Sequence, residues 1–566
     1  MEEKVEKKNN DIQRALILQG GGALGAFEAG AIKAFCEKLS EEDKHEVEQG
    51  RRKPRKGPLF NIVAGASIGA VNAAILVHNV IHRPNGKNTE EQKIIWEDAV
   101  NSVYSFYDEI SKRGGMIHPM WWIDNFLLEN QLFKNFWLQW EGVRKIWNSQ
   151  SDTFYQFLSF GNKDGLQEGV AKNPFQSGRY FASFPDKWGL PADPEIARRY
   201  YSYWWSLIYG SPGVLGPAMI QPDTKFLDPL WFTHIFTRFN NDPLVETMKN
   251  YWPFDMEEYS AIKTEKKDES EQPRLLIVTM DVHDFTTPVI FDSFAKKNNS
   301  KSKKRDSDAN LWYTEYGEKY NDGDNTPQRK YRINYPEGIS VDHVKASMAT
   351  PLRYEYPQFW VTNQENNKEE KRTFWDGAFL ANTPLRQVIQ AYREYWKKDE
   401  EEGLEKIPDL EIFIVNLYPT VEKGDAVPSS ADTIQDRQTD ITFHDRTKYE
   451  IRVDQMRSDY IELLDDIIPI LQKHDSKKLD KILERKTRKS ENKNNFVKKK
   501  ELIRNRFKIG RVVYVERTEG IGSTIFGKAF DFSPKTIEEL KEKGYEAAKS
   551  AFVKCSEEYC DFRESN

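Results

Sequence analysis

The chain has 566 residues, of which 38% are hydrophobic and 30% are charged. This length leaves room for one large domain with insertions or for a few smaller domains. The formal net charge of −6 at pH 7 argues against nucleic acid as the main partner.

The chain shows no feature of a secreted or membrane-spanning protein. Residues 1–13 form a charged tail without the apolar segment of a secretory signal. The longest apolar stretch, Ile62–Val77, is shorter than the roughly 18–20 residues of a membrane span. The three cysteines, Cys36, Cys555 and Cys560, are too few for a disulfide framework or a zinc site. We therefore expect a cytoplasmic protein without metal or cofactor, and peripheral contact with a membrane stays an open alternative.

Two strand–helix units open the chain. The apolar run Arg14–Gln19 ends in glycines and predicts a buried strand, and Ala26–Leu39 predicts a helix. The charged segment Ser40–Gly57 predicts a surface loop. Strand and helix then recur at Leu59–Ala64 and Ile68–Val80. This alternation predicts a parallel α/β sheet.

Residues 100–270 differ in character from the flanking chain. Ten of the fifteen tryptophans lie between Trp121 and Trp252, in segments with wide apolar faces. We predict an aromatic-rich helical insertion here. Two interpretations stay open: a helical subdomain with its own core, and an apolar lid or acyl-chain pocket over an active site.

Strands and helices alternate again after the insertion. Lys296–Asp324 is polar and predicts a loop. The basic segment Lys473–Lys508 predicts a solvated helical face or loop, with a patch for anionic lipid headgroups as the alternative. Further strands are predicted at Arg274–Asp281, Thr287–Phe291, Thr373–Trp375, Leu410–Leu417 and Arg511–Glu516, and further helices at Val341–Met348 and Thr536–Phe552.

A candidate nucleophile lies between the second strand and the second helix. The segment reads Gly65-Ala66-Ser67-Ile68-Gly69. Serine is a weak nucleophile that needs a base and an exposed position, which a tight strand-to-helix turn supplies. The small residues Gly65 and Gly69 allow the strand and helix to approach each other. Ser67 is therefore the predicted nucleophile.

The glycines after the first strand form a candidate anion site. Backbone N–H groups of Gly20, Gly21, Gly22 and Gly25 would gather at a helix N-terminus. In acyl transfer such a loop stabilises the oxyanion. A dinucleotide site is the competing interpretation, but it needs an acidic residue after the second strand. That strand runs into the Ser67 turn instead, so we favour the oxyanion loop.

The base is harder to assign. None of the nine histidines follows a late strand in an obvious catalytic context, whereas Asp376-Gly377 does. A buried aspartate with a raised pKa beside the flexible Gly377 would be able to take the Ser67 proton. Local sequence alone favours the alternative, a simple turn at Asp376-Gly377.

These three segments resemble the motifs of the patatin-like phospholipases. The family has a glycine-rich oxyanion loop, a G-x-S-x-G elbow and a late D-G-A/G, here Gly20–Gly25, Gly65–Gly69 and Asp376–Ala378 in the same order. The segment Ala346–Pro351 before the aspartate is also similar to the family, and the resemblance runs from about Arg14 to Arg386.

The resemblance implies a three-layer α/β/α sandwich with a mainly parallel central sheet. It implies a Ser67–Asp376 dyad that hydrolyses lipid acyl esters through an acyl-enzyme, without histidine or cofactor. Many members carry Arg or Lys where this chain has Leu24, which leaves the headgroup preference open.

The resemblance also suggests a domain division. We predict a catalytic domain over 14–390 and a C-terminal α/β extension over 391–566, which is similar to an extension in some bacterial and archaeal members. Two other functions stay open. One is a Ser-His-Asp esterase or thioesterase with His444 as a candidate histidine, and the other is a lipid-binding module without catalysis. The oligomeric state is not predicted.

Overall fold

A computed structural model provides the structure of the chain. It describes residues 12–55, 57–83, 89–115, 216–217, 239–254, 261–264, 272–295, 311–319, 328–351, 356–396, 407–419, 431–444, 446–488, 496–503, 506–518 and 528–557. Most of the predicted aromatic insertion and Cys560 lie outside these residues, so neither interpretation of the insertion is tested.

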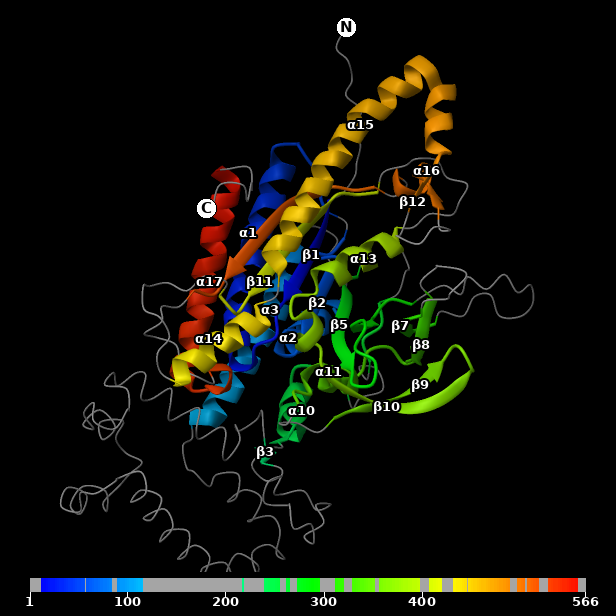
Figure 1. The fold of residues 1–566 in the computed structure, drawn as a ribbon. Helices are drawn as coiled ribbons and strands as arrows, with labels where there is room; N and C mark the ends of the chain where they lie inside the picture. Colours follow the sequence, from blue (N-terminus) through cyan, green and yellow to red (C-terminus); the bar gives the residue numbers. More distant parts are fainter. Residues whose placement is uncertain are drawn as a thin grey trace, which may run out of the picture.

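A ten-stranded sheet forms the centre of the described structure (Figure 1). One half consists of five parallel strands, of which the four inner ones are buried along their whole length. In spatial order these are β14 (Ile509–Glu516), β11 (Leu410–Asn416), β1 (Gln13–Leu18), β2 (Ile62–Ala66) and β5 (Arg274–Asp281). Because β11 and β14 lie beside β1, the sheet continues across the domain boundary predicted near residue 390.

The other half of the sheet is antiparallel. Beyond β5 the order continues with β10 (Lys368–Asp376), β9 (Gln358–Asn363), β8 (Gln328–Asn334) and β7 (Tyr313–Lys319), while β6 (Val289–Asp292) also pairs with β5. Separate two-stranded ladders join β3 (Gly216–Pro217) to β4 (Phe239–Asn240) and β12 (Lys486–Arg488) to β13 (Phe496–Lys498).

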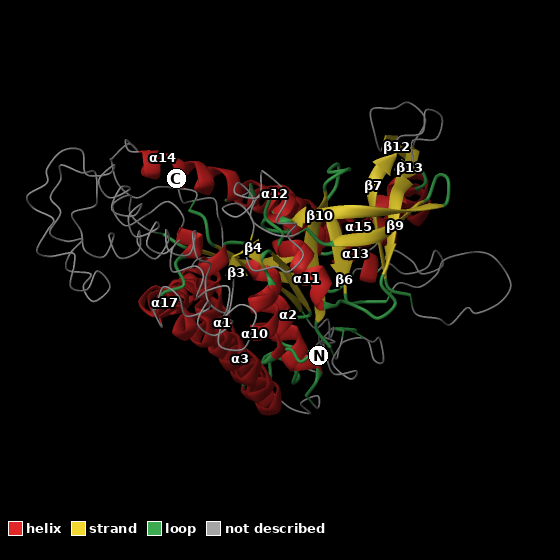
Figure 2. Ribbon diagram, turned by 90° about the horizontal axis from the view of Figure 1, so that it is seen from below, coloured by secondary structure: helices red, strands yellow, loops and turns green. Residues whose placement is uncertain are grey.

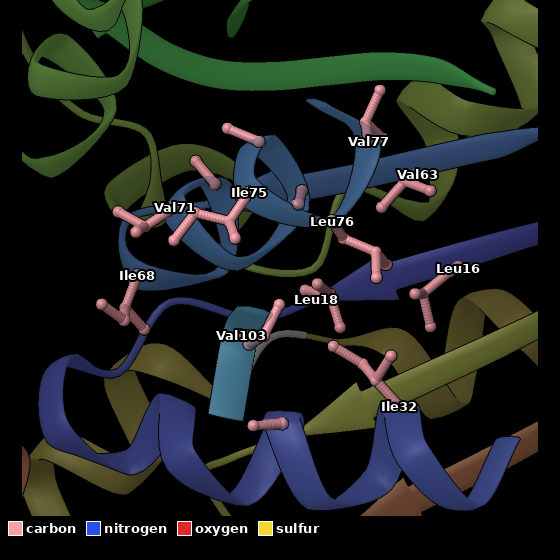
Figure 3. Close-up of a cluster of buried hydrophobic side chains, with 14 of the residues drawn as sticks. Leu16, Leu18, Ile32, Val63, Ile68, Val71, Ile75, Leu76, Val77 and Val103 are labelled. Atoms are coloured by element: carbon pink, nitrogen blue, oxygen red, sulfur yellow. The ribbon is translucent and has the colours of Figure 1, made fainter. Parts of the chain in front are cut away.

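Helices cover both faces of the parallel half. One face carries α1 (Gly25–Glu48), α2 (Ile68–Ile81), α3 (Thr89–Gly115) and α17 (Pro534–Glu557), and Figure 2 shows the first three gathered on one side of the strands. Leu16, Leu18 and Val63 point from the strands into this layer (Figure 3).

The alternate side chains of the same strands face the opposite layer. Ala15 and Ile17 pack there with Val388 of α13 (Leu385–Tyr395) and Ile451 of α15 (Thr447–Leu483). This two-residue alternation is what a strand buried on both faces requires. The predicted α/β/α sandwich is therefore confirmed. The remaining elements are η1 (Gly22–Leu24), α10 (Asp242–Lys249), α11 (Val341–Met348), α12 (Ala378–Ala381), α14 (Ala431–Phe443), α16 (Lys499–Ile503) and η6 (Lys528–Phe530).

Two predicted loops are wrong in part. Ser40–Gly57 is helical as far as Glu48, because Asp43 accepts two hydrogen bonds of 2.7 Å from the buried guanidinium of Arg14. This ion pair makes a charged stretch part of the core. The segment Lys296–Asp324 contains β7, whose Tyr316 is 1% exposed beneath the antiparallel strands.

One predicted strand is longer than expected, and one helix was not predicted. The run Thr373–Trp375 is the end of β10, whose earlier charged residues form an exposed hairpin with β9. Helix α3 crosses the predicted start of the insertion at residue 100, and its Trp96, Val103 and Phe106 belong to the core.

None of the described helices combines the length and apolar character needed to cross a bilayer. In the basic segment, the helical part of α15 beyond Lys473 is largely exposed, as predicted for a solvated face. The alternative of a lipid-headgroup patch there is not tested.

Candidate active site

Ser67 forms a strained turn between β2 and α2. Its backbone has φ 53° and ψ −125°, a region that costs a residue with a side chain about 1–3 kcal/mol. The strand and helix meet closely beside it, because a Cβ atom on Gly65 would lie 2.2 Å from the Gly69 carbonyl oxygen. The predicted glycines are therefore required by the turn, and such strain is typical of functional sites.

A second serine fixes the backbone of this turn. The Ser67 N–H donates to Ser347 Oγ at 2.9 Å, and the Ser347 hydroxyl donates to the Val278 carbonyl at 2.6 Å. Ser347 lies on α11 and is fully buried. Ser347 belongs to the family-like segment Ala346–Pro351, but no role was predicted for it.

Asp376 lies beside Ser67 at the end of β10. Its carboxylate accepts hydrogen bonds from the Ala378 N–H at 2.9 Å and the Thr350 hydroxyl at 3.2 Å, and the Ser67 side chain lies near enough to lower its pKa. The fold thus brings together the two residues that the sequence analysis paired.

Burial controls the protonation of Asp376, whose residue surface is 3% exposed. Removal from water raises the pKa of its carboxyl from 3.8 to about 6, although the Ala378 N–H and the nearby hydroxyls of Ser67 and Thr350 oppose the rise. At neutral pH the group is mainly ionised, yet its pKa is close enough to neutrality for proton exchange with a substrate.

The glycine loop lies directly against Ser67. A Cβ atom on Gly20 would be 2.7 Å from Ser67 Cβ and 2.7 Å from Asn382 Oδ1. The Gly20 N–H already donates to Asn382 Oδ1 at 2.8 Å, and the Gly25 N–H donates to the Gly22 carbonyl. Across the described ranges, the N–H groups of Gly21 and Gly22 have no such internal acceptor. These two are therefore the available donors among the four predicted glycines.

Substitution of Gly22 tests whether the position of the glycine loop matters for catalysis. It has φ +59°, and an added Cβ would lie 2.3 Å from the Ala529 carbonyl oxygen. We expect Gly22→Ala to lower kcat by about 10-fold or more, because the loop must shift by a large part of an ångström. Gly50 is the matched control, since it has φ +66° but open space around its Cα. Gly50→Ala is expected to leave kcat unchanged in a steady-state ester assay, and equal kcat in both variants would contradict a role for the loop.

A buried polar group holds the start of α1 beside the loop. Asn72 Nδ2 donates to the Gly25 carbonyl at 3.1 Å and to Glu28 Oε2 at 2.8 Å, while the Tyr107 hydroxyl donates to Asn72 Oδ1 at 3.0 Å. Burial raises the pKa of Glu28 well above its usual value. Sequence reasoning missed these residues because their partners come from three helices.

Among the described residues, no histidine is hydrogen-bonded to the Asp376 carboxylate. Its hydrogen-bond donors there are the Ala378 N–H and the Thr350 hydroxyl. The ring of His444 instead bonds through Nδ1 to the Ile441 carbonyl at 2.9 Å. Burial lowers the pKa of His343 to about 3, and its ring is bound to Ser340. His118 and His234 lie outside the described residues.

The described residues form no metal centre. Over the part of the chain that the structure describes, no three His, Cys, Asp or Glu side chains are grouped as ligands.

Comparison with known proteins gives one informative match. No curated protein matches the chain. Among solved structures, VipD from Legionella pneumophila matches 96% of this chain and 67% of its own at 11% identity, with a TM-score of 0.26, too low to carry an argument. A family model described as patatin-like phospholipase matches residues 16–389, about two thirds of the chain and all three motifs. The chain therefore belongs to the patatin-like phospholipase family.

Proposed function

We propose that the protein is a serine lipid acyl hydrolase that uses a Ser67–Asp376 dyad. One observation carries the proposal: a buried carboxylate with a pKa raised to about 6 lies beside a serine on a strained turn. Membership of the patatin-like phospholipases supports a lipid ester as the substrate class. The headgroup and the acyl length stay open.

The first half of the reaction forms an acyl-enzyme. Ser67 Oγ attacks the ester carbonyl carbon while Asp376 takes the hydroxyl proton. The carbonyl oxygen becomes an oxyanion, which the N–H groups of Gly21 and Gly22 stabilise. The C–O bond to the alcohol then breaks, and the alcohol leaves with the proton from Asp376.

The second half returns the free enzyme. A water molecule gives its proton to Asp376 and attacks the acyl carbon, the same N–H groups stabilise the second oxyanion, and Ser67 leaves with the proton. The fatty acid is released. Asp376 acts alternately as base and acid, a task for which a pKa near 6 is suited.

The pH dependence of lipid hydrolysis tests this proposal. Purified protein is expected to release fatty acid from phospholipid vesicles and to cleave a short-chain chromogenic ester. Because Asp376 must be ionised to accept the proton, kcat/KM is expected to be low below about pH 5 and to rise with a midpoint near the Asp376 pKa of about 6. Vesicle binding without any ester cleavage would favour the lipid-binding alternative, and a flat profile through pH 6 would contradict Asp376 as the base.

A further inference from the structure

We propose that segments beyond the family match position the oxyanion loop for catalysis, with Gln19 and the Lys528–Asp440 ion pair as positioning residues. This inference rests on the proposed function. The family match ends at residue 389. The contacts that hold both ends of the glycine loop come largely from after that point.

Gln19 ties the start of the loop to the C-terminal part of the chain. It is fully buried and directly precedes Gly20. Its Oε1 accepts hydrogen bonds from the backbone N–H groups of Leu417 at 2.6 Å and Tyr418 at 3.2 Å. Both residues come just after β11. Its Nε2 donates to Thr383 Oγ1 at 2.9 Å and to the Phe443 carbonyl at 3.1 Å. One side chain therefore connects the loop to β11 and α14.

The end of α14 also supports Asn382, the acceptor of the Gly20 N–H. Asn382 Nδ2 donates to the Phe443 carbonyl at 2.7 Å. The Phe443 ring packs edge-on against Phe379 at 5.4 Å between centroids. The Phe443 carbonyl is thus shared by two side chains that contact the start of the glycine loop.

The other end of the loop rests on η6. The Ala529 carbonyl lies so close to Gly22 that no side chain fits between them. Lys528 Nζ binds Asp440 Oδ1 at 2.7 Å, with 8% and 0% of the two side chains exposed. This buried ion pair joins η6 to α14. Buried ion pairs seldom add much stability, but they can fix one arrangement of the elements they join.

These contacts bear on catalysis because oxyanion donors act only when correctly placed. A misplacement of about 1 Å lowers rates by about 100-fold. The donors contribute in the transition state, so a shifted loop lowers kcat while KM changes little. A purely structural role would reduce the fraction of folded enzyme without changing kcat per active site.

The test is the paired variant Asp440→Asn/Lys528→Met, which removes both charges and leaves neither buried alone. Endpoint titration of Ser67 with a fluorophosphonate counts the active sites, and ester hydrolysis then gives kcat per site. We expect kcat per site to fall by about 10-fold or more with KM within about two-fold. The matched control is Asp108→Asn/Lys541→Met, which removes a 2.6 Å ion pair between α3 and α17. Its kcat per site is expected to match the wild type.

A second variant tests the other end of the loop. Gln19→Glu keeps an acceptor for the N–H groups of Leu417 and Tyr418 but replaces the donor to the Phe443 carbonyl by oxygen. It is expected to lower kcat per site in the same way. Wild-type kcat per site in both variants would overturn the inference and leave the proposed function standing. If the wild-type protein does not hydrolyse esters, both the inference and the proposed function are overturned.

Discussion

Replacing Asp376 by asparagine is expected to lower kcat for ester hydrolysis by about 10²- to 10⁴-fold. In the wild type the Ala378 N–H donates a hydrogen bond to Asp376 Oδ1 at 2.9 Å. The side-chain oxygen of asparagine also accepts this bond, so the turn at the end of β10 is retained. What is lost is the group that takes the Ser67 proton. Steady-state assays at pH 8 measure the effect. The control is Asp342→Asn on the neighbouring helix α11, where the carboxylate is exposed and its loss is expected to leave kcat unchanged.

The same variant is expected to be more stable than the wild type at neutral pH. A carboxyl whose pKa is raised on folding from 3.8 to about 6 binds its proton more tightly in the folded state. The stability that this contributes is complete below about pH 4 and is lost as pH rises through about 6. The difference corresponds to about 3 kcal/mol at pH 8.

Asp376→Asn avoids this loss, so its free energy of unfolding should exceed that of the wild type at pH 8. The two should converge below about pH 4. Urea unfolding at both pH values measures the difference. A wild type equal to the variant at pH 8 would show that Asp376 has an ordinary pKa and contradict its assignment as a tuned base.

Replacing Ser67 is expected to lower the rate of hydrolysis by about 10⁴-fold or more, because no acyl-enzyme forms.

The alanine and glycine variants of Ser67 are expected to differ in stability. Ser67 has φ 53°. An alanine at this φ costs conformational free energy, whereas a glycine adopts it freely. We expect Ser67→Gly to exceed Ser67→Ala by about 1 kcal/mol in free energy of unfolding. Equal stability of the two variants would argue against strain at the turn.

The parallel half of the sheet was predictable because its strands are short apolar runs. Arg274–Asp281 coincides with β5, and Val341–Met348 coincides with α11. The turn at Ser67 was equally visible, since a glycine-flanked serine between an apolar strand and helix has few other structural uses. Local sequence patterns were sufficient to predict a strand or helix wherever burial of its apolar side chains alone determines its formation.

Contacts between distant segments decided the features that sequence reasoning missed. The charged end of α1 folds as a helix because Arg14 pairs with Asp43, and no local pattern records that pair. Ser347 supports the site through a hydrogen bond from Ser67, and Asn382 through two hydrogen bonds with Gly20. Both lie in segments next to predicted motifs, so a polar residue beside a motif was the one available signal.

The proposed base illustrates the limit of sequence reasoning most clearly. Local sequence favoured a turn at Asp376, and only the order of the family motifs favoured catalysis. Its burial and its position beside Ser67 arise because β10 pairs with β5, which lies next to β2. Pairing of these strands could not be inferred from composition or periodicity.

Fluorophosphonate labelling followed by peptide mapping shows whether Ser67 is a nucleophile that Asp376 activates. We expect one labelled residue, Ser67, in the wild type, and much slower labelling of Asp376→Asn at pH 8. A label on any other residue, or labelling of Asp376→Asn at the wild-type rate, would contradict this mechanism.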